Sequence, residues 1–106
     1  MTYTVILTSR AEADRDDAYR WYEANYSPQY AAKWYKGLHE ALQSLSQNPT
    51  RCPLAPENDL LPCEVRQFLY GTRRKNHRAL FTVYKEMVAV LYIRHTKQPS
   101  LTEDEL

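Results

Sequence analysis

The stretch Ser27–Leu45, SPQYAAKWYKGLHEALQSL, decides the fold of this chain. Ser27 suits the cap of a helix, and Pro28 suits the first helical position, where its missing N–H does no harm. Apolar side chains then recur at steps of three and four residues, which places them on one helical face. These are Ala31, Trp34, Leu38, Ala41, Leu42 and Leu45. The stretch therefore predicts an amphipathic helix that ends at Asn48-Pro49.

Another helix, over residues 10–26, is predicted directly before it. Ser9 and Glu12 have the spacing of a capping box, in which Ser9 is the cap. The break between the two helices is short, so we expect an antiparallel hairpin. The buried face of the first helix is expected to carry, in chain order, Ala11, Ala18 and Trp21, with Tyr22 toward its margin.

Strands are predicted on both sides of this hairpin. Residues 3–7 are rich in β-branched and aromatic types and predict a short strand. Residues 48–62 hold four prolines and predict a stiff, extended connector without regular structure over most of its length. Three further strands follow, over residues 63–70, 76–84 and 87–94, the last two joined by a turn at Lys85-Glu86.

The last of these strands is apolar on both faces. Strict alternation would place Val88, Val90 and Tyr92 on one face and Ala89, Leu91 and Ile93 on the other. A strand that is apolar on both faces belongs in the centre of a sheet. The sequence thus predicts an α+β fold of order β-α-α-β-β-β, in which an N-terminal strand and a helical hairpin precede three antiparallel strands of a twisted sheet.

Length and composition predict one domain over residues 1–106. No apolar run approaches the ~20 residues of a membrane helix, and the N-terminus lacks the features of a signal peptide. Cys52 and Cys63 stand apart, without ligand spacing, so neither a disulfide framework nor a zinc site is expected. We therefore expect a cytoplasmic protein with no membrane contact, no metal and no cofactor.

Charge is distributed unevenly along the chain. Residues 1–50 hold five basic and six acidic side chains, whereas residues 51–100 hold nine basic and four acidic ones, a net charge of +5. The last six residues add three acidic side chains. A basic segment of this kind indicates a polyanionic ligand or an acidic protein partner.

Over nearly its whole length the sequence resembles the RelE/ParE toxin superfamily, in the branch associated with plasmid stabilisation. Each motif is weak alone, but their order and spacing together are fairly specific. The matching stretches are LTSRAEAD at 7–14, Trp21-Tyr22, NPTRCPLAPE at 48–57, Leu69-Tyr70-Gly71 leading to Arg78-Ala79-Leu80-Phe81, and VLYIRH at 90–95.

The resemblance implies a helical hairpin on a twisted sheet and the function of a toxin in a type II toxin–antitoxin pair, with a cognate antitoxin as partner. Some members cut messenger RNA on the ribosome, whereas others poison DNA gyrase without cutting RNA. This sequence departs from the pattern at His77, where an aromatic residue is usual, and in the loop Arg94-His95-Thr96-Lys97-Gln98, which lacks a glycine. The resemblance therefore leaves the activity open.

Our leading hypothesis from the sequence is a ribosome-dependent mRNA endonuclease. Cleavage without a metal needs an acid, a base and cations around the phosphate. His95 or His77 can exchange a proton near neutral pH, although a backbone-bonded structural histidine is nearly as good an interpretation of either. The arginines suited to holding the phosphate are Arg66, Arg78 and Arg94.

Further residues are expected to bind phosphate or RNA, as a cationic turn, a loop lysine and a stacking aromatic. They are Arg73, Arg74, Lys75, Lys97 and Tyr70. The alternative functions are a non-enzymatic gyrase inhibitor, for which no proton transfer is needed, and a module whose only robust activity is antitoxin binding.

Overall fold

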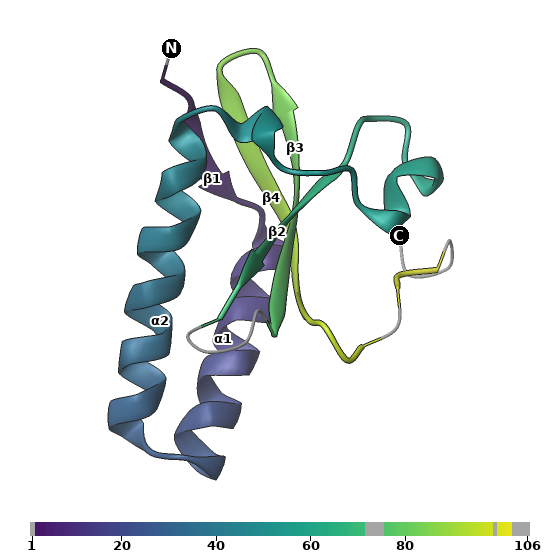
Figure 1. Ribbon diagram of the computed structural model, residues 1–106. Helices are drawn as coiled ribbons and strands as arrows, with labels where there is room; N and C mark the ends of the chain where they lie inside the picture. Colours follow the sequence, from purple (N-terminus) through teal and green to yellow (C-terminus); the bar gives the residue numbers. More distant parts are fainter. Residues whose placement is uncertain (1, 72–75, 99, 103–106) are drawn as a thin grey trace.

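The structure, a computed structural model, describes residues 2–71, 76–98 and 100–102. A four-stranded sheet carries a two-helix hairpin on one face (Figure 1). The elements follow the order β1 (Thr4–Leu7), α1 (Ser9–Asn25), α2 (Pro28–Gln43), β2 (Arg66–Tyr70), β3 (His77–Tyr84) and β4 (Met87–His95). This is the predicted β-α-α-β-β-β order.

The strands lie in the order β1-β4-β3-β2. β1 runs parallel to β4, and the two pairs formed by β2, β3 and β4 are antiparallel. β4 therefore has a neighbour on each side, which confirms its predicted central place and accounts for its apolar side chains on both faces.

Helix α1 begins one residue earlier than predicted, and its cap is Thr8 rather than Ser9. Thr8 Oγ1 accepts a hydrogen bond from the Ala11 amide at 3.2 Å. The same hydroxyl lies 3.0 Å from the Val90 carbonyl of β4. The predicted Ser9 cap is therefore wrong, because Thr8 both caps the helix and ties it to the central strand, which local spacing does not reveal.

The faces of the two helices were predicted unequally well. On α2, Ser27 caps the helix as predicted, and Trp34, Leu38 and Leu42 are buried against the sheet. On α1 the prediction that Trp21 is buried and Tyr22 lies toward the margin is wrong. Trp21 is 54% exposed, whereas Tyr22 is only 5% exposed. Tyr22 is the buried residue of the two because its ring packs against Trp34 of α2 and His77 of β3.

The connector between α2 and β2 is more regular than predicted. Short 3-10 helices occupy Ser44–Ser46, Pro49–Arg51 and Pro56–Leu60. Proline is acceptable at the first position of such a turn because no hydrogen bond is needed there. The connector also pairs with the sheet, since the Gln67 amide donates to the Pro53 carbonyl at 3.0 Å, and β2 begins at Arg66 rather than at residue 63.

A bulge changes the faces of β4. Phe81 of β3 pairs with Val90, whereas Leu80 pairs with Tyr92, so Leu91 is an extra residue. An extra residue reverses the alternation beyond it. Val88, Val90 and Ile93 consequently share the main core under the helices, and Tyr92 packs in a smaller cluster on the opposite face. The predicted grouping of Val88, Val90 and Tyr92 is wrong for this reason.

Two apolar clusters hold the sheet. The larger lies between the helical hairpin and the sheet, and the smaller, around Ala55, Val65 and Leu80, lies under the connector. Within the described part of the chain, the helices fall short of the length and apolarity that crossing a bilayer demands. The ends of β3 and β4 that carry the candidate residues lie beside α1 (Figure 1).

Candidate functional site

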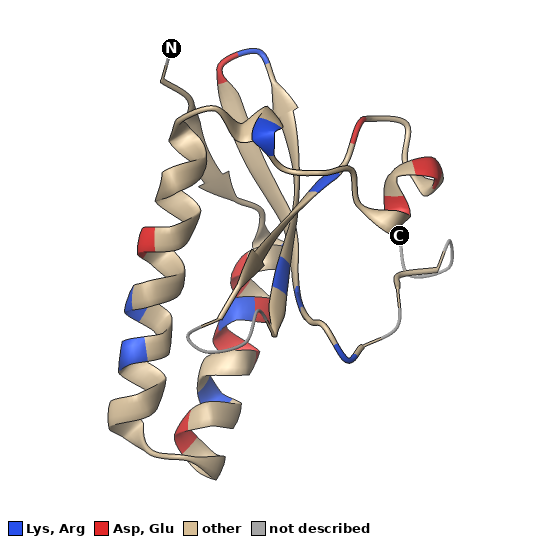
Figure 2. Ribbon diagram, viewed as in Figure 1, with Lys and Arg blue, Asp and Glu red and all other residues tan. Residues whose placement is uncertain are grey.

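A groove of about 1010 Å³ lies between α1 and the C-terminal end of β4. One wall is helical and carries Arg10, Asp14, Asp17, Trp21 and Tyr22; the other carries the residues from Ile93 to Gln98, and Asn76 and His77 lie between them. Figure 2 shows acidic and basic positions interleaved along α1, with separate basic positions on β3, on β4 and after β4. The groove therefore combines aromatic, cationic and anionic side chains.

His77 begins β3 and lies at the bottom of the groove. It is 4% exposed, and its ring lies 5.1 Å from that of His95 and 5.2 Å from that of Trp34. Burial, together with the neighbouring His95, lowers the pKa of His77 from 6.5 to about 4. His77 is therefore neutral at neutral pH, with Nδ1 3.0 Å from the Asn76 side-chain oxygen.

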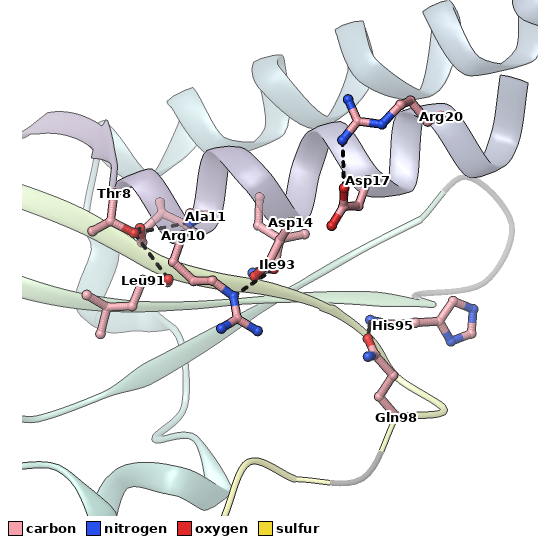
Figure 3. Close-up of polar contacts among 11 residues, drawn as sticks. Thr8, Arg10, Ala11, Asp14, Asp17, Arg20, Leu91, Ile93, His95 and Gln98 are labelled. Atoms are coloured by element: carbon pink, nitrogen blue, oxygen red, sulfur yellow. Dashed lines mark hydrogen bonds and ion pairs between the residues drawn. The ribbon is translucent and has the colours of Figure 1, made fainter. Parts of the chain in front are cut away.

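His95 ends β4 and lies between His77 and the following turn. Its Nδ1 accepts a hydrogen bond from the Lys97 amide at 3.0 Å, so the proton of the neutral ring is on Nε2. Its own amide donates to Gln98 Oε1 at 2.8 Å (Figure 3). The structure thus brings the two predicted histidines together, with His95 the more accessible of the two.

Arg78 is committed to an internal carboxylate. Its two terminal nitrogens bond to the two oxygens of Glu57, with Nη1 2.8 Å from Oε1 and Nη2 in close contact with Oε2. Burial alone would raise the pKa of Glu57, but the bonds from Arg78 and from the Leu101 amide hold it below its ordinary value. Arg78 therefore neutralises Glu57 and ties the connector and Leu101 to the sheet.

Arg66 and Tyr70 are also engaged within the fold. Arg66 donates to the Cys52 carbonyl at 2.6 Å and forms an ion pair with Glu64 at 2.7 Å. The Tyr70 hydroxyl donates to the Trp34 carbonyl at 3.1 Å, and burial raises the pKa of Tyr70. Neither side chain lines the groove, although Tyr70 pairs in register with His77 and both rings contact Trp34.

The remaining predicted residues divide between the groove and the chain outside the structure. Arg94 is 7% exposed and pairs in register with Arg78, and Lys97 is exposed on the turn after β4. Both line the groove. Arg73, Arg74 and Lys75 lie outside the described residues, as does the acidic end of the chain.

The arrangement of a capped helical hairpin on a β1-β4-β3-β2 sheet has known counterparts. Residues 5–99 match the family model described as the ParE toxin of the type II toxin–antitoxin system parDE. The chain belongs to this ParE toxin family. Membership in this family confirms the prediction that the chain is the toxin of a type II toxin–antitoxin system, within the wider RelE/ParE superfamily.

Solved structures with the same fold include ParE-family and RelE-type systems. The chromosomal ParDE system from P. aeruginosa matches with a TM-score of 0.73 and 24% identity, over 91% of this chain and 98% of that one. The toxin–antitoxin complex RelBE2 from Mycobacterium tuberculosis matches with a TM-score of 0.53 and 24% identity, over 90% and 99%. At this identity the likeness shows the fold alone. The search of curated proteins gave no significant match.

Sequence reasoning missed three side chains that build the site of this ParE-family toxin. In the sequence Glu57 is one of the four acidic residues of the basic segment. In the structure its side chain is fully buried and forms an ion pair with Arg78. Asp14 lies on α1, and its Oδ2 accepts a hydrogen bond from the Ile93 amide of β4 (Figure 3). Gln98 was taken as a loop residue. No local signal identifies them, because the partners of Glu57 and Asp14 are distant in sequence.

No metal cluster is apparent in the described residues. Among them no three His, Cys, Asp or Glu side chains come together at a separation that would hold an ion. The groove offers hydrogen-bonding groups, charged side chains and aromatic surface.

Proposed function

We propose that this toxin acts by binding a protein target, DNA gyrase, and that an antitoxin holds it inactive by occupying its basic surface. The observation that carries the proposal is the Glu57–Arg78 ion pair. A guanidinium that already binds a carboxylate through two nitrogens has little capacity left for the phosphate of an RNA substrate. A binding mechanism requires no such capacity.

The state of the other predicted nuclease groups supports the same choice. Arg66 donates to backbone carbonyls, and His77 is buried with its pKa lowered to about 4. A general base or acid works best when its pKa lies near the operating pH. Of the two histidines predicted for proton transfer, only His95 is partly exposed, since His77 is buried.

The antitoxin part of the proposal rests on the family and on charge. The family takes its name from a two-protein system, and the two similar structures are of toxin–antitoxin systems. The segment of net charge +5 would attract an acidic antitoxin segment. We place the pair, and gyrase, in the cytoplasm, and we take the chain as one domain.

Messenger RNA cleavage on the ribosome is the second candidate. It is favoured by the position of His95 in the groove beside Arg94 and Lys97. In that mechanism His95 is the acid or base, Arg94 and Lys97 hold the phosphate, and Arg78 and Arg66 would have to exchange their internal partners for the substrate. His77 would hold the His95 ring in place.

Two assays on the purified toxin separate these functions. We expect inhibition of gyrase supercoiling at roughly micromolar toxin, with relief by the antitoxin encoded beside it. Primer extension on translated mRNA should show no new ends. Unaffected gyrase together with new mRNA ends that disappear in a His95→Ala, Arg78→Ala double variant would overturn the proposal in favour of cleavage.

A module that only binds its antitoxin would neither inhibit gyrase nor cut mRNA, but it would still form a complex with the antitoxin. The neighbouring gene offers the first check, because an acidic protein with a DNA-binding N-terminus is expected there. Induction of the toxin alone, with translation and replication followed separately, provides the second. Early loss of replication supports gyrase as the target.

A further inference from the structure

The two edges of the sheet are closed to different degrees. At the β2 edge the connector pairs with the strand, since the Gln67 amide donates to the Pro53 carbonyl at 3.0 Å. The Ala55 amide donates to the Val65 carbonyl at 2.8 Å and extends this pairing. At the other edge the sheet ends on β1, a strand of four residues whose neighbour is β4. β1 is therefore the edge at which a further strand can be added.

The backbone groups of β1 alternate between β4 and the outside of the sheet. The Thr8 amide, directly after β1, donates to the Val90 carbonyl of β4 at 3.0 Å. Successive residues of a strand direct their N–H and C=O groups to opposite sides, so Val5 and Leu7 direct theirs away from β4. Among the residues that the structure describes, these two amides and two carbonyls form no hydrogen bond. The outer edge of β1 thus has two unused donors and two unused acceptors.

β1 also lacks the side chains that protect an exposed sheet edge. Charged residues, lysine above all, and proline are the usual protection. Residues 2–9, TYTVILTS, contain neither. Val5 and Leu7 pack against the main core, whereas Ile6 lies on the face opposite the helices and is 41% exposed. An uncharged strand rich in β-branched residues pairs readily with another strand.

The open part of this edge is complementary to a second copy of itself. In an antiparallel pair with a twofold axis at Ile6, Val5 of each chain lies opposite Leu7 of the other. Each such pair exchanges two N–H···O bonds, so all the outward groups of both copies are used. The two Ile6 side chains then lie opposite one another and cover their exposed surfaces. A foreign strand is less favoured, because residues 2–9 carry no charge that would select one.

We propose that two copies of this chain associate through antiparallel pairing of β1, which joins their four-stranded sheets into one continuous sheet. The paired segment is short, so the dissociation constant is expected to be roughly 10–100 µM for toxin without its antitoxin. This goes beyond the proposed function, because neither gyrase nor the antitoxin takes part in the contact.

Sedimentation equilibrium of the purified full chain tests the pairing. Ile6→Lys places two like charges opposite one another, so it should weaken self-association at least about fivefold. Tyr84→Lys, the same charge at a 63% exposed position of β3, should leave it unchanged. A mixture of Ile6→Lys and Ile6→Glu should associate again, because opposite charges then meet at position 6.

Hydrogen exchange followed by NMR locates the contact. The Val5 and Leu7 amides should become protected as the protein concentration rises, whereas the Ile6 amide, which faces β4, should be protected at every concentration. A chain that stays monomeric at about 1 mM would overturn the proposal. So would equal association of Ile6→Lys and Tyr84→Lys, or a mixture of the two position-6 variants that fails to associate.

Protection of Val5 and Leu7 by added antitoxin, but not by concentration, would also overturn self-pairing and would assign this edge to a strand of the antitoxin. Gyrase inhibition is measured separately, so its failure leaves the result for β1 standing.

Discussion

Glu57 and Arg78 lie 21 positions apart in the chain and form an ion pair with side-chain exposures of 0% and 7%. The same carboxylate accepts the Leu101 amide at 2.9 Å. One buried acid therefore joins the connector, the third strand and the segment after the fourth. This arrangement gives the first prediction.

Glu57→Gln should lower the free energy of unfolding by about 3–5 kcal/mol, because it leaves the Arg78 guanidinium buried without its counter-charge. Urea denaturation measures this. Glu64→Gln, which removes the exposed partner of Arg66, should change it by less than about 1 kcal/mol. Equal losses in the two variants would contradict a special role for the buried pair.

Stability should fall in strong acid through Glu57. Because its pKa is lowered in the fold, its contribution is complete above the ordinary value of 4.5 and is lost as the pH falls through the lower folded-state pKa. Unfolding free energies measured from pH 5 downward should therefore decline, and Glu57→Gln should flatten that decline. If the unfolding free energy of Glu57→Gln declines by the same amount, the decline is caused by other carboxylates.

His77 should produce a separate loss of stability in weak acid. The unfolded chain binds a proton near pH 6.5 and the folded chain only near pH 4. The contribution of neutral His77 is therefore complete above about pH 6.5 and declines steadily down to about pH 4. Unfolding measured across this window should show the decline, and His77→Gln should remove most of it. His39→Gln, at an exposed position on α2, is the matched control.

Thr8→Ala should destabilise the protein by about 1–2 kcal/mol, since it removes the cap of α1 and a bond to β4. Ser9→Ala should change stability by a few tenths of that amount. Thermal unfolding of the two variants side by side measures the difference. A larger loss of stability in Ser9→Ala would contradict Thr8 as the cap and support Ser9 instead.

Gly37→Ala should be destabilising although alanine favours a helix. A Cβ at position 37 would lie 2.4 Å from the Tyr70 hydroxyl oxygen, a clash worth about 1–3 kcal/mol. Tyr70→Phe removes that oxygen, so in its background Gly37→Ala should become neutral or stabilising by up to about 1 kcal/mol. A double-mutant cycle in urea tests this, and additive effects would contradict it.

The elements themselves followed from local patterns. The three- and four-residue spacing of α2, its Ser27 cap and the turn at Lys85-Glu86 depend only on near neighbours, and the structure confirms them. The apolar character of β4 also gave its central place. The errors lie where a distant group overrides a local rule, as at Thr8, which bonds to Val90, and at Tyr22, which packs on His77.

The candidate site could be predicted only in part. The sequence indicated a basic C-terminal half with two histidines, and the structure places His77 and His95 in contact. It also gives Arg78 and Arg66 internal partners, which residue type alone does not reveal, because an arginine suited to a phosphate is equally suited to a buried carboxylate.

The sequence by itself therefore determined the order of the elements, the hairpin, the central strand and the resemblance to a toxin family, since each depends on periodicity, caps and motifs within short segments. Only the tertiary structure decided which charged side chains pair inside the fold and which helix residue bonds to the last strand. Those properties arise when Glu57 meets Arg78 and Asp14 meets Ile93, contacts between residues that the chain separates by 21 and 79 positions.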